Sequence, residues 1–407
     1  MTKDKEKRMT PEIRFKGFSG DWEQRKLGSE SKILTGGTPK TSIPEYWEPK
    51  KIPWMSSGEV NKRRLDGTDN MISEEGLNNS SARWVKKYSV LIALAGQGKT
   101  RGTVAVNNIQ LTTNQSIAAI VPNDNLYYEF IYQNLIKRYD ELRMISSGDG
   151  TRGGLNKQIV SDIVMPSPSR DEQYKIGTFF KQLDDTIALH QQKYELLIKL
   201  KKAYLQLIFP KTGESTPKVR FADFHDNWEQ CKLGDLGSVA MNKRIFKNQT
   251  SENGEVPFFK IGTFGSYPDA FISRKLFEEY KSKYPYPEVG DILISASGSI
   301  GRTVVYQGED EYFQDSNIVW LKHNGRLDNK FLKQFYSIVK WQGLEGSTIK
   351  RLYNKNILDT NISVPTLAEQ NKLGAFFEQL ENAITLRQQK VASLKSLKQA
   401  YLQKMFV

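Results

Sequence analysis

The amino-acid sequence is built from two copies of one pattern, and this repetition constrains the fold more than any other feature. PEIRFKGFSGDWEQRKLG begins at Pro11 and recurs as PKVRFADFHDNWEQCKLG from Pro217, with 10 identities over 20 aligned positions. The segment from Glu172 to Phe209 matches the segment from Glu369 to Phe406 at 21 of 38 positions. Unrelated sequences would agree at about two of them. The chain is therefore an internal duplication.

Between these repeated anchors the two copies share a layout but differ in detail. VLIALAGQGKTRGTVAV, from Val90, has a loose counterpart in ILISASGSIGRTVVY, from Ile292. TRGGLNKQIVSDIVMP, from Thr151, corresponds to IKRLYNKNILDTNISVP, from Ile349. The remaining parts of the two middles barely align. Each copy thus consists of a repeated frame around a divergent middle.

The middles predict compact α+β globules. Short β-branched and aromatic runs such as VLIALA, SIAAIV, DILISA and NIVWL are separated by Gly, Asn and Pro, which is typical of strands and turns. LYYEFIYQNLIKRY and LDNKFLKQFYSIV read as one helix in each copy. We expect two similar α+β domains, 1–165 and 211–364, each followed by a long helix, in 166–210 and 365–407.

The repeated closing segments predict two long helices that pair. Each begins after a Ser/Thr/Pro-rich start, and apolar residues then recur at alternating steps of four and three, the pattern of a coiled-coil seam. We expect an antiparallel pair of about 57 Å related by a pseudo-twofold axis, with His190 and Arg387 as a polar layer near its midpoint. The alternative is that each helix lies on its own globule. The seam positions are Ile176, Phe180, Leu183, Ile187, His190, Tyr194 and Leu197, and Leu373, Phe377, Leu380, Ile384, Arg387, Val391 and Leu394.

Composition excludes several classes of protein. The single cysteine, Cys231, excludes a disulfide scaffold or thiolate zinc cluster and suits a reducing cytoplasm. The charged start MTKDKEKRMTPEIRF contains no secretory signal, and apolar runs are too short to span a bilayer. We therefore expect a soluble cytoplasmic protein without a bound metal. The net charge of +13 favours a polyanionic partner such as nucleic acid, although it also serves solubility.

Catalytic motifs are weak. AGQGKT resembles a phosphate-binding loop, but Ala93 occupies the position where the motif requires glycine. Asp269, Glu279 and Lys281 have the residue types of a metal-dependent nuclease, yet the first copy has no equivalent. The chain contains no Pro-Pro and hence no Asn/Asp-Pro-Pro-Tyr/Phe signature of amino-methyltransferases. We expect no catalytic residues.

Basic residues instead recur in glycine-punctuated loops of both copies. Arg, Lys and Asn side chains hold phosphates and read base edges, although any single cluster can also be a solvated surface. Recurrence at matching places favours DNA. The candidate DNA-binding residues are Lys62, Arg63, Arg64, Lys99, Arg101, Arg152, Asn156 and Lys157 in the first domain, and Lys243, Arg244, Lys247, Lys260, Arg302, Lys350, Arg351, Asn354 and Lys355 in the second.

These motifs, taken together, resemble the specificity (S) subunit of type I restriction-modification enzymes over essentially the whole chain. The resemblance is carried by FSGDWEQRKLG and FHDNWEQCKLG, by ILISASGSIGRT, and by VPTLAEQNKLGAFFEQLENAI with its first-copy twin. The chain departs from the family pattern in one loop. The first copy has AGQGKTRGT at a place where family members usually have a shorter loop, like that of the second copy.

The resemblance implies a non-catalytic subunit whose two domains each read one half of a bipartite, interrupted DNA site. It implies docking of two methyltransferase subunits and of motor-nuclease (R) subunits, with S-adenosylmethionine, ATP and Mg bound by those partners rather than by this chain. The paired helices would then set the spacer between the half-sites. A stand-alone DNA-binding protein and a metal-dependent nuclease remain the alternative hypotheses.

Overall fold

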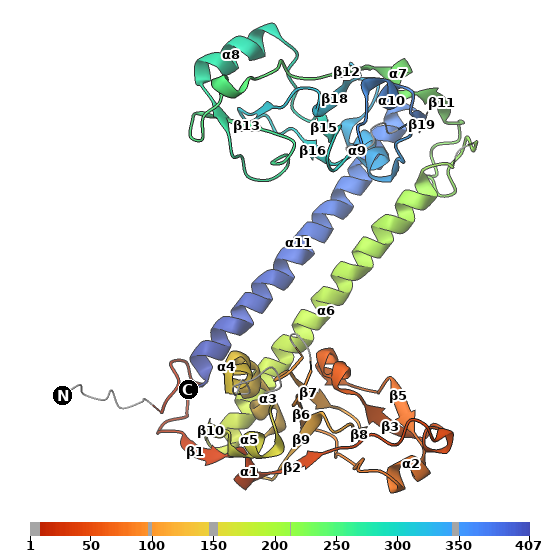
Figure 1. The fold of residues 1–407 in the computed structure, drawn as a ribbon. Coiled ribbons are helices and arrows are strands. Elements are labelled where there is room, and N and C mark those ends of the chain that lie inside the picture. The colour runs from red at the N-terminus through yellow and green to blue at the C-terminus, as the bar shows by residue number, and fades with distance from the viewer. Residues whose placement is uncertain (1–8, 97–99, 146–153, 212, 344–349) are drawn as a thin grey trace, which may run out of the picture. The chain divides into compact units, whose positions relative to one another are not determined.

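The computed structural model describes residues 9–96, 100–145, 154–211, 213–343 and 350–407, and the chain divides into two compact units. Unit 1 comprises Met1–Gln191 and Gln389–Val407, and unit 2 comprises Gln192–Gln388. Each unit holds the globule of one copy together with a part of each long helix, α6 (Arg170–Ile208) and α11 (Leu367–Met405) (Figure 1). The units are described separately below.

Unit 1 is an α+β globule built around a five-stranded sheet of order β2-β9-β6-β7-β4, with a three-stranded sheet β5-β3-β8 and the strand pair β1-β10. The expected apolar runs form its central strands. The strands are β1 (Glu23–Lys26), β2 (Ser31–Thr35), β3 (Ile52–Met55), β4 (Arg64–Leu65), β5 (Asn70–Ile72), β6 (Val90–Ala93), β7 (Val104–Asn107), β8 (Thr112–Thr113), β9 (Ile117–Pro122) and β10 (Val164–Ser167). The helices before α6 are α1 (Leu27–Glu30), α2 (Glu74–Asn78), α3 (Tyr128–Lys137), α4 (Tyr139–Ile145) and α5 (Lys157–Asp162).

Unit 2 repeats this plan with fewer strands. Its sheets have the orders β12-β18-β15-β16, β14-β13-β17 and β11-β19. The strands are β11 (Glu229–Lys232), β12 (Ser238–Ala240), β13 (Val256–Phe259), β14 (Phe271–Ile272), β15 (Ile292–Ser295), β16 (Thr303–Val305), β17 (Tyr312–Phe313), β18 (Ile318–Lys322) and β19 (Asn361–Val364). The helices besides α6 and α11 are α7 (Leu233–Leu236), α8 (Arg274–Lys283), α9 (Asn329–Ile338) and α10 (Asn354–Leu358).

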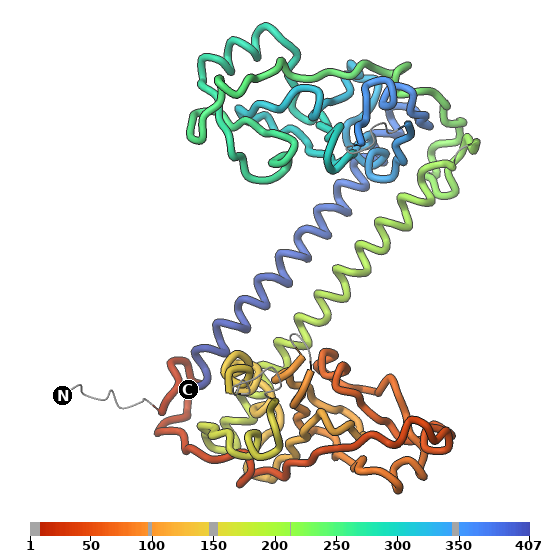
Figure 2. Tube along the Cα trace, viewed as in Figure 1, coloured from red at the N-terminus to blue at the C-terminus, as the bar shows by residue number. Residues whose placement is uncertain are grey.

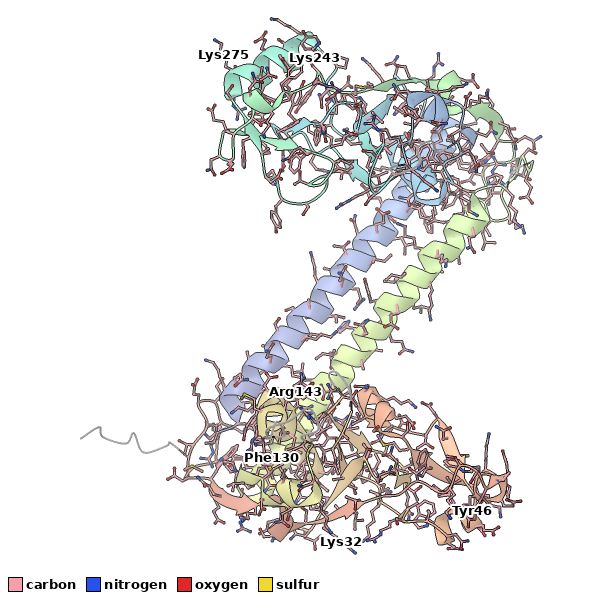
Figure 3. The ribbon with its side chains drawn as sticks, in the orientation of Figure 1. Lys32, Tyr46, Phe130, Arg143, Lys243 and Lys275 are labelled. Atoms are coloured by element: carbon pink, nitrogen blue, oxygen red, sulfur yellow. The ribbon has the colours of Figure 1, made fainter. Side chains whose placement is uncertain are left out.

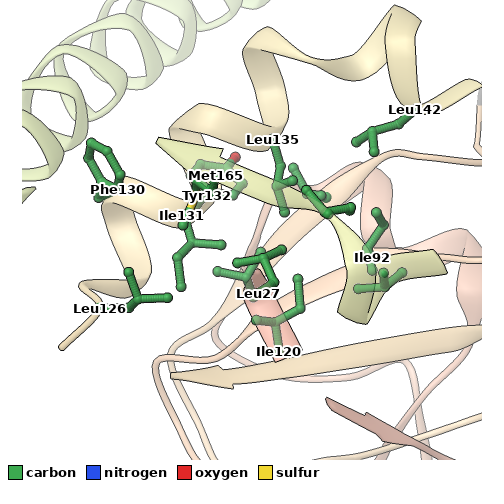
Figure 4. Close-up of a cluster of buried hydrophobic side chains, with 14 of the residues drawn as sticks. Leu27, Ile92, Ile120, Leu126, Phe130, Ile131, Tyr132, Leu135, Leu142 and Met165 are labelled. Atoms are coloured by element: carbon green, nitrogen blue, oxygen red, sulfur yellow. The ribbon is translucent and has the colours of Figure 1, made fainter. Parts of the chain in front are cut away.

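A core of aliphatic and aromatic side chains lies between the central sheet of unit 1 and its helices. Figure 4 shows Leu27, Ile92 and Ile120 facing Phe130 and Leu135 of α3, and all five are fully buried. Burial of one such side chain contributes about 1.5–3 kcal/mol. Val90 and Ile92 of β6 lie in this core, and Leu91 and Ala93 lie in a second core on the other face of the strand. Both faces of β6 are therefore covered, which explains its continuous apolar run.

The end of each long helix completes the core of the other copy's globule. In unit 1, Phe406 beyond the end of α11 lies 5.1 Å from Phe130 and 6.3 Å from Trp22, measured between ring centroids. Figure 2 shows the C-terminal end of the chain against the globule of the first copy. In unit 2, Phe209 beyond the end of α6 stacks on Phe331 at 5.3 Å and meets Trp228 at 6.1 Å.

The long helices pack against each other in an antiparallel sense within each unit. In unit 1, Phe179 meets Tyr401 with ring centroids 5.3 Å apart. In unit 2, Tyr204 meets Phe376 at 5.1 Å. The α+β fold with two long paired helices is therefore confirmed, and the alternative that each helix lies only on its own globule is wrong. All 14 seam positions, including His190 and Arg387, are buried or half-buried.

An arginine in each entry segment fixes the start of each long helix. Arg14 donates through Nε (2.7 Å) and a terminal nitrogen (2.8 Å) to the two carboxylate oxygens of Glu172. Arg220 makes the equivalent pair of bonds to Glu369, at 2.8 and 2.7 Å. Both carboxylates are almost completely buried, so the bidentate pair compensates a charge that would otherwise be costly. The arginine that the entry motif repeats in both copies therefore has a structural role in the frame.

Candidate nucleic-acid interface

In unit 2, predicted DNA-binding residues converge on the turn between β17 and β18, residues 314–317. Arg244 donates from Nε to Asp315 at 3.0 Å. Arg351 donates from a terminal nitrogen to the side-chain oxygen of Asn317 at 2.8 Å. Two cations from segments more than one hundred positions apart in the sequence are therefore attached to one turn.

Two further predicted cations lie on loops that border this turn. Gln314 ties the turn to the loop after β13, because its backbone N–H donates to Phe259 (2.9 Å) and its side-chain oxygen accepts from the Ile261 N–H (2.9 Å). Lys260 lies on that loop, and Arg302 reaches it with a bond to the Gly265 carbonyl at 2.8 Å. Lys260, Arg302, Arg244 and Arg351 therefore share one surface region.

This region of unit 2 has the character of a polyanion-binding surface. Arg244 is 60% exposed and Lys260 is 41% exposed, so both reach solvent. Among the residues that the structure describes, one acceptor is found for the guanidinium of Arg244 and one for that of Arg302. This bond orients the group and leaves other N–H groups for a ligand. Oriented guanidinium groups suit both phosphates and base edges.

The remaining predicted residues of the second domain are more scattered. Lys243 lies over the ring of Tyr284, which follows α8, at 5.1 Å. Figure 3 labels Lys243 and Lys275 at this end of unit 2. Lys247 is exposed at the start of a short turn of helix, and Lys350 is exposed next to Arg351. Asn354 and Lys355 lie on the side of the frame, because they begin α10, which packs against α7.

In unit 1 the predicted cluster of three cations does not form one surface. Lys62 donates to Glu59 (3.0 Å) and to Asp69 (2.6 Å), so its charge is paired locally. Arg63 is exposed and has a left-handed backbone (φ 65°), and its guanidinium donates to the Val104 carbonyl at 3.3 Å. Arg63 remains well placed to contact a ligand.

Arg64 points the other way, into the frame of unit 1. Its guanidinium forms a bidentate pair with Glu129 and lies 3.6 Å from Asp184 and 4.7 Å from the ring of Tyr132. Glu129 is fully buried, so its charge requires this partner. Arg64 therefore has a structural role, which is not visible from its position in a basic run.

The other predicted residues of the first domain lie near the variable loops. Arg101 is half-buried between β6 and β7. The Asn156 side chain accepts from the Ile159 N–H and caps α5, and Lys157 is exposed in the first turn of that helix. Lys99 and Arg152 lie outside the described residues.

One polar pair in unit 1 was not among the residues that the sequence pointed to. The Thr38 hydroxyl donates to the side-chain oxygen of Gln115 at 2.6 Å, and both residues are exposed. Gln115 lies in the turn between β8 and β9, the counterpart of the 314–317 turn. A search for cations passes over these neutral residues, whereas a strand-by-strand alignment of the two copies would have found them.

A second repeated feature links the two long helices to α3 or α9. In unit 1, Asp184 of α6 accepts from Gln133 of α3 (2.8 Å) and from Lys398 of α11 (2.6 Å). Burial lowers the pKa of Lys398, and the carboxylate of Asp184 acts against that shift.

The equivalent cluster in unit 2 contains a glutamate. Glu381 of α11 accepts from Lys201 of α6 (2.6 Å), Lys333 (2.5 Å) and Gln334 (3.0 Å) of α9. Burial alone would raise the pKa of Glu381, but the hydrogen bonds from these three residues outweigh it and lower the pKa to about 2. Both clusters belong to the frame, because their glutamine, acid and lysine occupy matching positions in the two copies.

The catalytic alternatives gain no support from the geometry. Asp269 pairs with Lys260, Glu279 with Lys283, and Lys281 with Asp310, so each residue of the nuclease pattern has its own partner. The part of the chain that the structure describes contains no group of three metal-ligating side chains. Nor does any described helix combine the length and the apolar character needed to cross a membrane.

Known proteins resemble this chain in sequence and in fold. The family model described as the type I restriction modification DNA specificity domain matches twice, at residues 19–199 and 225–396. A putative type I restriction enzyme specificity subunit of Haemophilus influenzae is 58% identical over 158 residues, which are 38% of this chain and 41% of that protein. The MjaIX specificity subunit of Methanocaldococcus jannaschii is 24% identical over 95% of this chain and 92% of its own length.

The fold comparison agrees with the sequence comparison. The crystal structure of the type I restriction-modification S subunit from M. genitalium covers 98% of this chain and 99% of its own, with a TM-score of 0.65 at 16% identity. The two family matches cover most of both copies, including the frame and the loops described above. The chain therefore belongs to the type I restriction-modification DNA specificity family.

Proposed function

We propose that this chain is the DNA-reading subunit of a type I restriction-modification complex, and that each of its two globules reads one half of an interrupted site. The observation that carries the proposal is the convergence of Arg244, Lys260, Arg302 and Arg351 on one divergent region of unit 2. The two half-sites differ because the corresponding loops of the two copies differ.

The repeated frame supports a second part of the proposal. Identical partners require identical docking surfaces, and the long helices are the most similar parts of the two copies. Two methyltransferase subunits would therefore dock on the frame, and R subunits would join them for restriction. S-adenosylmethionine, ATP and Mg would be bound by those partners, and this chain would contribute no catalytic residue.

The test is to sequence modified bases in the DNA of the source cell, by a single-molecule method, with and without this gene. We expect one bipartite, interrupted motif to lose its methylation when the gene is deleted. An unchanged set of methylated motifs would contradict the proposal. Binding of the purified chain to random duplexes would then show whether it is a stand-alone DNA-binding protein.

A matched insertion tests the role of the helices. Adding seven residues to α6 and to α11 keeps the heptad pattern of the seam and lengthens both helices by about 10 Å. We expect the methylated motif to keep its two half-sites and to gain unspecified base pairs between them. A motif with an unchanged spacer would rule out this role.

A further inference from the structure

The strand registers align the two variable regions residue by residue. β9 pairs with β6 so that Ile117 faces Ala93, and β18 pairs with β15 so that Ile318 faces Ser295. On the other side, Leu34 of β2 faces Ala119, which is two residues past Ile117, and Ala240 of β12 faces Trp320, which is two residues past Ile318. Leu34 and Ala240 are therefore equivalent.

This register makes two polar pairs equivalent. Thr38 lies four residues after Leu34, and Arg244 lies four residues after Ala240. Their partners, Gln115 and Asp315, each follow a residue that is bonded to the last residue of a strand. The Asn114 N–H donates to the Met55 carbonyl at the end of β3 (3.0 Å). The Gln314 N–H donates to the Phe259 carbonyl at the end of β13 (2.9 Å). Counted from β8 and β17, the contact between Thr38 and Gln115 and the contact between Arg244 and Asp315 thus lie in corresponding turns, although the turn before β9 has three residues and the turn before β18 has four.

The two pairs differ in chemistry at this shared position. In unit 1 the Thr38 hydroxyl occupies one side of the Gln115 oxygen, and in the described part of the chain no partner is found for the Gln115 amide nitrogen. In unit 2 the carboxylate of Asp315, whose side chain is only 16% exposed, accepts from Nε of Arg244. The described residues supply no partner for the two terminal nitrogens of Arg244. Each pair presents one oriented recognition group to solvent.

We propose that these equivalent pairs are base-reading positions, with Gln115 recognising an adenine in one half-site and Arg244 recognising a guanine in the other. An amide group matches the donor and acceptor of adenine in the major groove, and a guanidinium matches the two acceptors of guanine. Thr38 and Asp315 are positioning residues that orient the reading side chain. This inference rests on the proposed function.

The exchange of chemistry argues for base reading over phosphate binding. A position that held only the phosphate backbone would serve any DNA sequence and would have no reason to change its chemistry between the copies. Here a neutral pair replaces a charged pair at the corresponding turn of the other copy. Different bases in the two half-sites would require such an exchange.

The test is the set of methylated motifs in source cells that carry Arg244→Gln or Gln115→Ala in place of the wild-type gene. Arg244→Gln should relax or change a single guanine in one half-site, and Gln115→Ala should relax a single adenine in the other half-site. Discrimination at the affected base pair should fall roughly 5- to 150-fold. Lys275→Gln, which removes an exposed cation from α8, is the matched control and should leave the motif unchanged.

The positioning role has its own readout. Thr38→Val keeps the shape of the side chain but removes the hydroxyl, and it should relax the same adenine as Gln115→Ala does. Thr38→Ser keeps the donor and should restore the wild-type motif. A structural role of Thr38 would instead lower the melting temperature without altering the motif.

The outcomes separate this inference from the proposed function. If deletion of the gene removes a motif, but Arg244→Gln lowers methylation equally at all sites without altering either half-site, the base-reading assignment is wrong. If Gln115→Ala and Arg244→Gln alter the same half-site, the equivalence is wrong. If deletion removes no motif, the proposed function fails and the inference fails with it.

Discussion

The charged cluster around Asp184 in unit 1 and the one around Glu381 in unit 2 contain the same three kinds of side chain, but different further residues join them. In both, a glutamine of the globule and a lysine of the opposite helix bond to one acid of the nearer helix. In unit 1 a half-buried arginine from the divergent middle, Arg64, joins the cluster through Glu129. In unit 2 the added cation is Lys333 of α9, and the residue equivalent to Glu129 is Lys330, which pairs with Glu378 near the surface.

This difference shows that a divergent segment can serve the frame. Arg64 belongs to a basic run that varies between the copies, yet its guanidinium stabilises a fully buried carboxylate of α3. Variation between the copies is therefore not by itself a sign of DNA contact. The two clusters offer a direct comparison, because equivalent substitutions should have different effects in the two units.

The largest effect is expected where the two units are most alike. Phe209→Ala and Phe406→Ala should each lower the free energy of unfolding by about 3–5 kcal/mol, because each removes a buried aromatic ring from a packed core. Urea unfolding gives the size of the loss, and hydrogen exchange shows where it falls. Phe209→Ala should loosen unit 2 first, and Phe406→Ala should loosen unit 1 first.

Leu207→Ala provides a control for that experiment, since Leu207 lies near the end of α6 but is 36% exposed. We expect a clearly smaller loss from it. If Phe406→Ala loosened unit 2 before unit 1, the assignment of each helix end to the opposite core would be refuted.

The next effect should separate the units. Arg64→Ala leaves the buried Glu129 without its partner and should cost about 3 kcal/mol, measured by chemical unfolding. The double variant Arg64→Met with Glu129→Leu removes both charges and should recover most of that loss. Failure of the double variant to recover stability would point to packing rather than charge.

A pH-dependent effect is expected in unit 2. The pKa of Glu381 is about 2 in the folded protein and lies near 4.5 in an exposed glutamate, so the carboxylate form stabilises the fold. This stabilisation is complete above pH 4.5 and is lost as the pH falls from 4.5 toward 2. With partial exposure of the side chain taken into account, it amounts to about 2 kcal/mol.

Glu381→Gln should therefore be less stable than the wild type at pH 7, and the difference should shrink by pH 3. Unfolding curves of both proteins at the two pH values measure this directly. Because all other carboxylates titrate in both proteins, the difference between them isolates Glu381. If the difference in free energy of unfolding between the two proteins were the same at pH 7 and pH 3, the ionised Glu381 carboxylate would not be the source of the stabilisation.

The smallest effect is expected at the surface pair that replaces the buried one. Lys330 and Glu378 are 53% and 46% exposed, so water screens their attraction. Lys330→Gln should change the free energy of unfolding by at most about 0.5 kcal/mol. A loss as large as that of Arg64→Ala would mean that exposure does not distinguish the two clusters.

The frame could be predicted well from the sequence because its segments recur in both copies, so each copy supports the interpretation of the other. Ile176 and Leu373 follow one heptad pattern, and the apolar runs at Val90 and Ile292 form central strands as expected. Long apolar periodicity depends on neighbours along the chain, so it can be read without knowledge of the tertiary structure.

The candidate DNA-binding residues were predicted less completely, because the contacts that decide their roles join residues far apart in the sequence. The role of Arg64 depends on Glu129, which is 65 positions away, and no local pattern connects the two. Gln115 lacked a charge and so carried no signal in a search for polyanion contacts. Arg244 and Arg351 were identified by residue type alone, and only the fold brings both to the 314–317 turn.

The way in which each helix end completes the opposite core also governs when the protein can finish folding during synthesis. The globule of the first copy is made early, but Leu402, Met405 and Phe406 of its core are synthesised only after the whole globule of the second copy. Until then Trp22 and Phe130 lack a covering aromatic ring, and a nascent chain with an open apolar core is prone to aggregate. Phe209 of the second core is synthesised before the second globule, so the first globule is the one that waits for the rest of the chain before its core can close.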